Sequence, residues 1–300
     1  MHIVIVGGTG FIGRALTEAL LAAGWRVTVA TRRSPAQASR VLPSGAAVLS
    51  WNAPGGLALP PGTDAVVNLA GASIARRWTQ AAKRLILESR VGTTRAVVAA
   101  LAAASARPRV LVNASAVGYY GRRGDEIVTE ADGPGQDFLA SVCRQWEAAA
   151  KEAEAAGIRV VLLRTGFVVG RGGAMRLMLL PYRLFLGGPL GSGQQWLPWI
   201  HLDDVVGLIR FALENEALQG PVNLTAPEPV RQEVFARALG RAMGRPAWLR
   251  TPAWALRTAL GEMADMLLTG QRAVPAAALA AGYTFRRPDL DEALRSVAAH

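Results

Sequence analysis

Three glycines near the N-terminus stand at a spacing that suits a bound phosphate group. Gly7, Gly10 and Gly13 match G-x-x-G-x-x-G, and Gly8, Gly10 and Gly13 also match G-x-G-x-x-G. The apolar residues 2–6 predict a buried strand before the turn, and leucines at helical spacing follow it. Such a turn brings backbone N–H groups and the positive end of a helix dipole to a pyrophosphate. The stretch predicts a dinucleotide site, with a tight turn that binds nothing as the alternative.

An arginine pair indicates which dinucleotide would bind. Residues 25–31 predict a second strand, and Thr31, Arg32 and Arg33 stand where it ends. An acidic residue here would accept the ribose hydroxyls of NAD, whereas arginine accommodates the 2′-phosphate of NADP. Because the chain has no acid at this point, we predict NADP. A solvated loop is the alternative role for the two arginines.

Strands and helices alternate along the chain and would position these residues. The predicted strands are residues 2–6, 25–31, 47–49, 64–71, 109–114, 158–164 and 221–225, and residues 195–204 are expected to return to the sheet. The predicted helices include residues 79–104, 137–156, 175–186, 205–214 and 251–268. Asp203 or Asp204 is expected to open the helix at 205–214.

This alternation predicts an α/β fold, a doubly wound parallel sheet of the Rossmann type with a smaller, mostly helical C-terminal lobe. Residues 1–170 and 195–226 are assigned to the dinucleotide-binding domain. Residues 171–194 and 227–300 are assigned to the small lobe, which would cover the substrate.

Composition argues against several other kinds of site. Cys143 is the only cysteine and there are three histidines, so no metal site is expected. The net charge of +11 invites a nucleic-acid partner, but the arginines are scattered and no basic stripe interleaves with aromatic residues. No apolar run reaches the roughly 18 residues that span a bilayer. We therefore expect a cytoplasmic protein without a nucleic-acid or membrane partner.

Together these motifs resemble the extended branch of the short-chain dehydrogenase/reductase superfamily, and within it the epimerase-like subfamily of the NAD-dependent epimerase/dehydratase type. The resemblance rests on residues 7–13, 68–71, 88–90, 115–121, 163–166, 199–204, 261–265 and 268–272. The last two stretches are similar to that subfamily's C-terminal domain of unknown function. The resemblance implies bound NADP(H) and a small-molecule substrate. It also implies the option of a homodimer, because many relatives build one from the helices matching 79–104 and 137–156.

The resemblance completes the expected cofactor site. The predicted contacts are Gly7, Thr9, Gly10, Phe11, Ile12, Gly13, Thr31, Arg32, Arg33, Leu69, Ala70, Gly71, Glu88, Arg90, Ala114 and Ser115.

Catalysis in that superfamily depends on Tyr-x-x-x-Lys on a helix, where the ammonium lowers the pKa of the phenol that transfers the proton. None of the four tyrosines here has a lysine four residues later. In the helix from Asp137, the two positions fall on Phe138 and Val142 in one register, or on Leu139 and Cys143 in the next. The expected catalytic serine position falls on Ala116, with Ser115 one residue earlier.

Other groups must therefore handle the proton if the chain is an enzyme. The candidates are Ser115, Tyr119, Tyr120 and the acids Glu126 and Glu130, of which we select Ser115 and Tyr120 as the catalytic pair. We predict an NADP-dependent oxidoreductase or epimerase acting on a small or nucleotide-linked carbonyl or hydroxyl compound. The alternative is a catalytically silent NADP(H)-binding regulatory or interaction protein.

Overall fold

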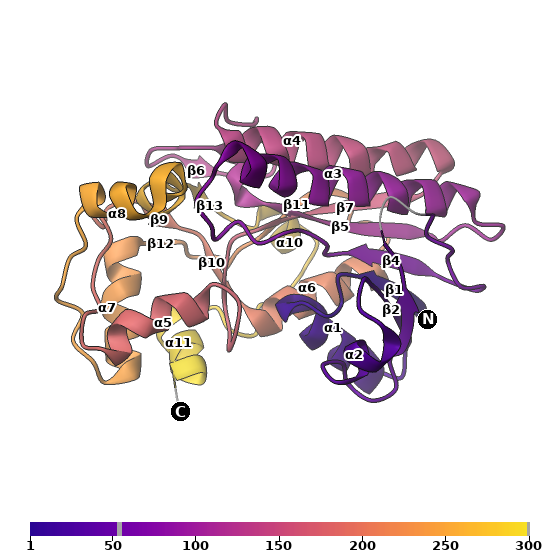
Figure 1. Cartoon of the computed structure of the whole chain (residues 1–300), viewed down its shortest axis with the longest axis horizontal. Coiled ribbons are helices and arrows are strands. Elements are labelled where there is room, and N and C mark those ends of the chain that lie inside the picture. Colours follow the sequence, from indigo (N-terminus) through magenta and orange to yellow (C-terminus); the bar gives the residue numbers. More distant parts are fainter. Residues whose placement is uncertain (53–55, 299–300) are drawn as a thin grey trace.

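A parallel sheet forms the centre of the computed structural model, which describes residues 1–52 and 56–298. Within these residues, seven strands follow the order β11-β7-β5-β4-β1-β2-β3 (Figure 1). They are β1 (His2–Val6), β2 (Arg26–Thr31), β3 (Ala47–Ser50), β4 (Ala65–Asn68), β5 (Val110–Ala116), β7 (Arg159–Thr165) and β11 (Gly220–Leu224). All neighbouring pairs are parallel. The order reverses between β1 and β4, which confirms the predicted doubly wound sheet.

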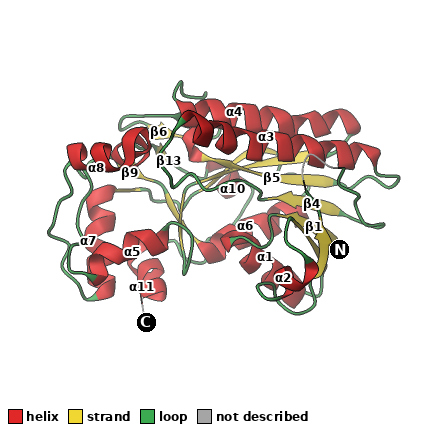
Figure 2. Cartoon of the chain, viewed as in Figure 1, coloured by secondary structure: helices red, strands yellow, loops and turns green. Residues whose placement is uncertain are grey.

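Helices cover both faces of this sheet (Figure 2). One face carries α1 (Phe11–Ala22), α2 (Pro35–Ser39) and α6 (Leu202–Glu214), and the other carries α3 (Gln80–Ala103) and α4 (Phe138–Lys151). Alternate residues of β1 divide between the two cores: Ile3 and Ile5 pack with the α1 and α6 side, and Val4 and Val6 with the α3 side. A strand buried on both faces explains the unbroken apolar run at its sequence position.

The two long helices begin where their capping residues predict. The hydroxyl of Thr79 accepts from the Ala82 N–H at the start of α3, and the carboxylate of Asp137 accepts from the Ala140 N–H at the start of α4. The second helix continues as a short 3-10 segment, η2 (Glu152–Ala156), and ends at Gly157 with a left-handed φ of 76°. These side-chain caps fix the helices relative to the sheet ends.

A second, mostly helical group of elements lies at one end of the sheet (Figure 1). It contains α5 (Met175–Arg183), α7 (Gln232–Met243), α8 (Ala253–Leu260), α9 (Asp265–Leu268) and α11 (Leu290–Ala298), with β9 (Trp196–Leu197) antiparallel to β12 (Val230–Arg231). Its core joins Met175 and Tyr182 of α5 to Phe235 of α7 and Leu294 of α11. The helical lobe expected from the sequence is present, and its domain boundaries stay a prediction.

Three sequence expectations were wrong in detail. Residues 195–204 do not rejoin the main sheet: β10 (Trp199–His201) pairs with β8 (Phe167–Val169) in a separate small sheet, because β11 already occupies the edge beside β7. Helix α6 is capped by the imidazole of His201, not by an aspartate. The helix expected at 251–268 is interrupted by η3 (Gly261–Ala264), where Gly261 adopts a φ of 62°.

The C-terminal region also returns to the main sheet. Strand β13 (Arg272–Ala273) runs parallel to β6 (Ile127–Val128), and α10 (Ala276–Ala280) packs against β11. Ala278 of α10 belongs to the same apolar core as β1 and α1. Residues assigned by sequence to the small lobe therefore complete the Rossmann core.

Candidate cofactor and active site

The glycine turn after β1 is shaped by close backbone contacts. Gly7 has a φ of +81°, and a Cβ atom added there would lie 2.9 Å from the backbone of Leu69 and Ala70. A Cβ atom on Gly13 would lie 2.5 Å from the Cα atom of Gly8. Glycine at these two positions lets the turn lie against the end of β4 and lets α1 begin directly above it.

The N-terminus of α1 is open to a ligand. Gly10 is its N-cap, and no side chain caps the helix. The amides of the first helical turn therefore lack the side-chain acceptor that a serine or aspartate would supply, and they present a partial positive charge. This cradle fits the pyrophosphate of a dinucleotide.

Phe11 has a second contact that the sequence did not indicate. Its ring lies against the loop after β8, because Cβ atoms added to Gly170, Gly172 or Gly173 would stand 2.7, 2.4 or 2.9 Å from ring atoms. The predicted cofactor contact of Phe11 stays a prediction. Ile12 next to it packs on the core below the sheet.

Arg32 and Arg33 lie at the end of β2, beside the glycine turn. The two segments are joined by the bond from the Gly7 N–H to the Ala30 carbonyl, 3.3 Å long. Both arginines are exposed, and neither guanidinium has a hydrogen-bond or ion-pair partner in the part of the chain that the structure describes. The Thr31 hydroxyl accepts from the Arg33 N–H at 3.3 Å. Two unpaired cations at this edge fit the 2′-phosphate of NADP.

Among the other residues predicted on the adenosine side, Arg90 and Gly71 are in contact with each other, whereas Glu88 is exposed. Arg90 is partly buried and donates to the carbonyls of Ala72, at 3.1 Å, and Ile86, at 3.0 Å, so it fixes the loop that follows β4. Burial lowers its pKa. A Cβ atom on Gly71 would lie 3.2 Å from the Arg90 guanidinium carbon. Glu88 is exposed, and its cofactor contact stays a prediction.

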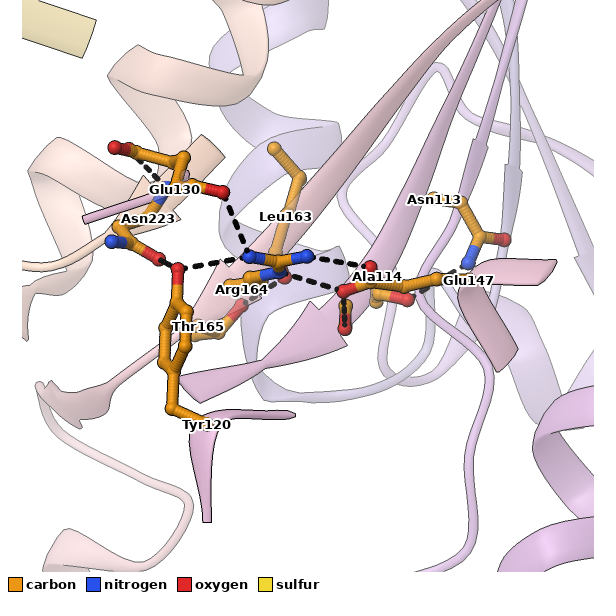
Figure 3. Close-up of polar contacts among 10 residues, drawn as sticks. Asn113, Ala114, Tyr120, Glu130, Glu147, Leu163, Arg164, Thr165 and Asn223 are labelled. Carbon is orange, nitrogen blue, oxygen red and sulfur yellow. Dashed lines mark hydrogen bonds and ion pairs between the residues drawn. The ribbon is translucent and has the colours of Figure 1, made fainter. Parts of the chain in front are cut away.

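A buried ion pair lies under the carboxyl ends of β5 and β7 (Figure 3). Glu147 of α4 receives two hydrogen bonds from Arg164 of β7, each 2.9 Å long, and both side chains are almost fully buried. Although burial by itself lowers the pKa of Arg164, the bonds to Glu147 raise it above its ordinary value. The sequence prediction missed this pair. A usable signal was that Glu147 stands at helical spacing among the apolar residues of α4, on the face that is buried.

The hydroxyls of Ser115 and Tyr120, selected from the sequence as catalytic, both form hydrogen bonds with this ion pair. Ser115 donates to Glu147 at 2.7 Å. Tyr120 accepts from Arg164 at 3.0 Å and donates to Asn223 at 2.7 Å (Figure 3). Burial raises the pKa of Tyr120 to about 12. A catalytic role for either stays a prediction, but these contacts give both hydroxyls a structural role.

Strand geometry explains the orientation of Ser115. Successive side chains of a strand point to opposite faces. Ala114 and Ala116 are partly exposed, whereas Ser115 between them is buried toward α4. The expected position of the catalytic serine is Ala116, and Ser115 stands one residue before it. Its side chain therefore points to the opposite face of the strand from Ala114 and Ala116.

The helix positions of the missing Tyr and Lys are filled by apolar contacts. The Phe138 ring meets that of Trp78 edge-on at 5.3 Å, and Leu139 lies 3.4 Å from the position of a Cβ atom on Gly118. Val142 and Cys143 are buried. Burial raises the pKa of the Cys143 thiol to about 12, so this group stays protonated at neutral pH.

Tyr119 differs from its neighbour. It belongs to η1 (Val117–Tyr120), is partly exposed, and its hydroxyl has no hydrogen-bond partner among the described residues. The Arg164 guanidinium carbon lies 3.5 Å from the centre of its ring. Of the acids considered, Glu130 is engaged by the Asn223 and Ala277 N–H groups, and Glu126 is exposed.

A basic aromatic cluster lies between the small lobe and the loop after η1. The Trp196 ring lies within 4.1 Å of the Arg231 guanidinium and 4.8 Å of the Arg272 guanidinium. Asp125 accepts from Arg231 at 2.7 Å and from the Trp196 indole at 3.0 Å, and these bonds lower its pKa. Sequence analysis did not single out this cluster, because its members come from four separate segments.

A sequence profile of the NAD dependent epimerase/dehydratase family matches residues 3–224. The chain belongs to this family. A second profile, a domain of unknown function (DUF1731), matches residues 251–297. Both matches confirm the resemblance drawn from the motifs.

Relatives of known sequence or structure match along nearly the whole chain. The epimerase family protein YfhF of Bacillus subtilis is 40% identical over 304 residues, covering 100% of this chain and 98% of its own. The chloroplastic SDR39U1 homolog of Arabidopsis thaliana is 41% identical, covering 99% of this chain and 86% of its own. The crystal structure of human epimerase family protein SDR39U1 with NADPH has a TM-score of 0.89 at 38% identity, with 99% of each chain covered.

The described residues lack two features that certain partners require. None of their helices is long and apolar enough to cross a membrane. The same residues contain no cluster of three or more His, Cys, Asp or Glu side chains arranged to hold a metal ion.

Proposed function

We propose that the chain is an NADP(H)-dependent oxidoreductase or epimerase that acts on a small or nucleotide-linked carbonyl or hydroxyl compound. The observation that carries the proposal is the unpaired Arg32 and Arg33 beside an uncapped helix N-terminus. The human relative solved with NADPH supports the same cofactor. When bound, the nicotinamide would supply or accept a hydride.

In this proposal each part of the chain has a separate task. The amides of the turn from Gly7 to Gly13 hold the pyrophosphate, and Arg32 and Arg33 hold the 2′-phosphate. Leu69, Ala70 and Gly71 allow the adenosine side to lie against backbone. Ser115 and Tyr120 act as positioning residues that fix the Glu147–Arg164 pair beneath the nicotinamide end.

Tyr119 is the proton donor that the geometry favours. Its hydroxyl is not engaged among the described residues, and the Arg164 guanidinium carbon lies 3.5 Å from the centre of its ring. Replacement by phenylalanine is expected to lower turnover by about 100-fold while leaving NADPH affinity unchanged. Tyr120→Phe is the matched variant; an equal loss of turnover in both would contradict the assignment.

The cluster of Trp196, Arg231 and Arg272 supports an anionic substrate. Two guanidinium groups beside an indole can bind a phosphate or carboxylate next to a planar ring. Asp125 neutralises part of this charge in the free protein, so substrate would compete for Arg231.

The cofactor is tested by calorimetric titration with NADPH and NADH. The double variant Arg32→Ala, Arg33→Ala is expected to lose about 10- to 100-fold in NADPH affinity, since charge-assisted hydrogen bonds are lost. NADH affinity should change little. Arg40→Ala, which removes an exposed arginine from the end of α2, is the control. Equal binding of both cofactors by the unchanged protein would contradict the NADP preference.

A cofactor-binding protein without turnover is the second candidate. It is favoured by the apolar residues at the Tyr and Lys positions and by the engaged hydroxyls of Ser115 and Tyr120. Tight NADPH binding without nicotinamide oxidation over a panel of carbonyl compounds would support it. The cytoplasmic location and the homodimer through α3 and α4 stay predictions.

A further inference from the structure

Helix α5 is apolar on two opposite faces. Met175, Leu179 and Tyr182 point into the core of the small lobe. Leu177, Leu180 and Leu184 recur at i, i+3 and i+7 and form a second stripe, with exposed fractions of 64%, 55% and 59%. Large apolar side chains gathered on an exposed helix face are typical of an interaction surface. We therefore expect the outer stripe of Leu177, Leu180 and Leu184 to contact a partner.

The stripe continues into the turn that ends the helix. Phe185 has a φ of 60° where glycine is the usual residue, and the bonds from Phe185 N–H to Tyr182 and from Leu186 N–H to Pro181 close the turn. Despite this backbone cost, Phe185 and Leu186 expose about half of their surface, at 52% and 50%. An aromatic side chain kept in a glycine position and turned to solvent points to binding.

Positive charge borders the same surface. No Asp or Glu occurs between residues 155 and 202. Arg176 and Arg183 are exposed, and neither guanidinium has a carboxylate partner within the described ranges. Arg245 lies 4.6 Å from the centre of the Phe185 ring and shares a shallow cavity with Trp248, which is 67% exposed.

The charges decide which partner fits. A second copy packed on the same surface by two-fold symmetry would bring these arginines against their own equivalents. Leucine, phenylalanine and tryptophan flanked by arginine are the side chains that enter the interface of an anionic bilayer.

We propose that α5, the turn at residues 184–186 and Trp248 dock on the surface of an anionic lipid bilayer. The sequence expectation of no membrane partner considered only a spanning segment, and docking requires none. The helix would lie in the plane of the interface, with Leu177, Leu180 and Leu184 among the upper acyl chains. Arg176, Arg183 and Arg245 would lie at the level of the phosphates.

Vesicle co-sedimentation of the full chain tests the proposal. Binding is expected to phosphatidylcholine vesicles containing phosphatidylglycerol and to be weak on phosphatidylcholine alone. Leu180→Gln with Leu184→Gln, and separately Arg176→Gln with Arg183→Gln, should each lower the partition coefficient about tenfold or more. The control variants are Leu279→Gln, which is comparably exposed at 49%, and the exposed pair Arg84→Gln with Arg144→Gln.

Phe185→Gly separates docking from stability. Glycine relieves the left-handed position, so the thermal midpoint should stay or rise while vesicle binding falls several-fold. In parallel, brominated lipids should quench part of the tryptophan fluorescence, and Trp248→Phe should remove that part.

Three results would overturn the proposal. One is the absence of sedimentation with anionic vesicles. Another is an equal loss in the Arg84, Arg144 control, which would mean attraction by net charge alone. The third is a stable dimer in solution that the Leu180, Leu184 variant dissociates, which would make a second copy the partner.

Discussion

At the glycine turn, α1 has no side-chain cap and Arg32 and Arg33 have no partner among the described residues. Beneath the ends of β5 and β7, by contrast, Ser115, Glu147 and Arg164 satisfy one another in nearly complete burial. Unpaired donors at a surface are available to a ligand, whereas buried groups that are already paired hold the fold. Side chains of a catalytic type can therefore serve the fold, and Ser115 is bonded in this way.

The largest test of this difference is removal of the buried carboxylate. Glu147→Ala leaves the Arg164 cation unpaired inside the protein and should lower the free energy of unfolding by about 3–5 kcal/mol. Urea denaturation measures it. Replacing Glu147 and Arg164 together by methionine should cost less than Glu147→Ala alone. A loss below 1 kcal/mol in the single variant would show that water reaches the pair.

Alkaline pH should lower the free energy of unfolding, because Tyr120 is buried beside the same ion pair. Burial raises the pKa of Tyr120 to about 12, above the value of about 10 in an unfolded chain. Its contribution is therefore complete below pH 10 and is lost as pH rises toward 12, by roughly 2–3 kcal/mol. Denaturation at pH 9 and pH 12 measures the loss. Tyr120→Phe should show a smaller loss, though not zero, because burial also raises the pKa of Tyr182 to about 12.

Two glycines of the turn should respond unequally to alanine. A Cβ atom on Gly13 would meet Gly8 at 2.5 Å, whereas one on Gly10 would meet only the Gly7 carbonyl at 3.2 Å. Gly13→Ala is expected to cost about 1–3 kcal/mol and to weaken NADPH binding, because α1 must move. Gly10→Ala should cost less in stability. Thermal unfolding with and without NADPH compares the two, and equal losses would refute the packing argument.

The smallest effect compares neighbouring tyrosines. Tyr120→Phe removes a buried hydroxyl that bonds to Arg164 and Asn223, and should lower the free energy of unfolding by about 1–2 kcal/mol. Tyr119→Phe should leave it unchanged, since that hydroxyl has no partner in the described part of the chain. Equal destabilisation by both would remove the distinction on which the choice of Tyr119 rests.

The sheet and its glycine turn could be predicted because their signals are local. The run before Gly7 alternates between two buried faces, and Thr79 and Asp137 cap the helices that they precede. The arginines after β2 could likewise be placed, because strand ends in a parallel sheet meet at one edge. Family membership followed from the same short motifs and is confirmed by the profile match.

The buried polar contacts beneath β5 and β7 could not be predicted, because they join distant segments. Ser115 and Glu147 are 32 residues apart, and Tyr120 and Asn223 are 103 apart. The orientation of Ser115 depends on the strand register, in which a shift of one residue reverses the face. Residues 195–204 have strand-like composition, but pairing, not composition, decided that they form two small sheets.

Asn223 and Glu130 form hydrogen bonds with residues near the C-terminus, and this has a consequence during translation. The Asn223 amide donates to the Val274 carbonyl, 51 residues later, and Glu130 accepts from Ala277, 147 residues later. At roughly 5–20 residues per second, a ribosome needs about 3–10 s to add the segment between Asn223 and Val274. Between the emergence of β11 from the ribosome and that of α10, the nascent sheet has all its strands but lacks the helix that covers part of its core. A newly synthesised chain therefore completes its Rossmann core only when α10 emerges.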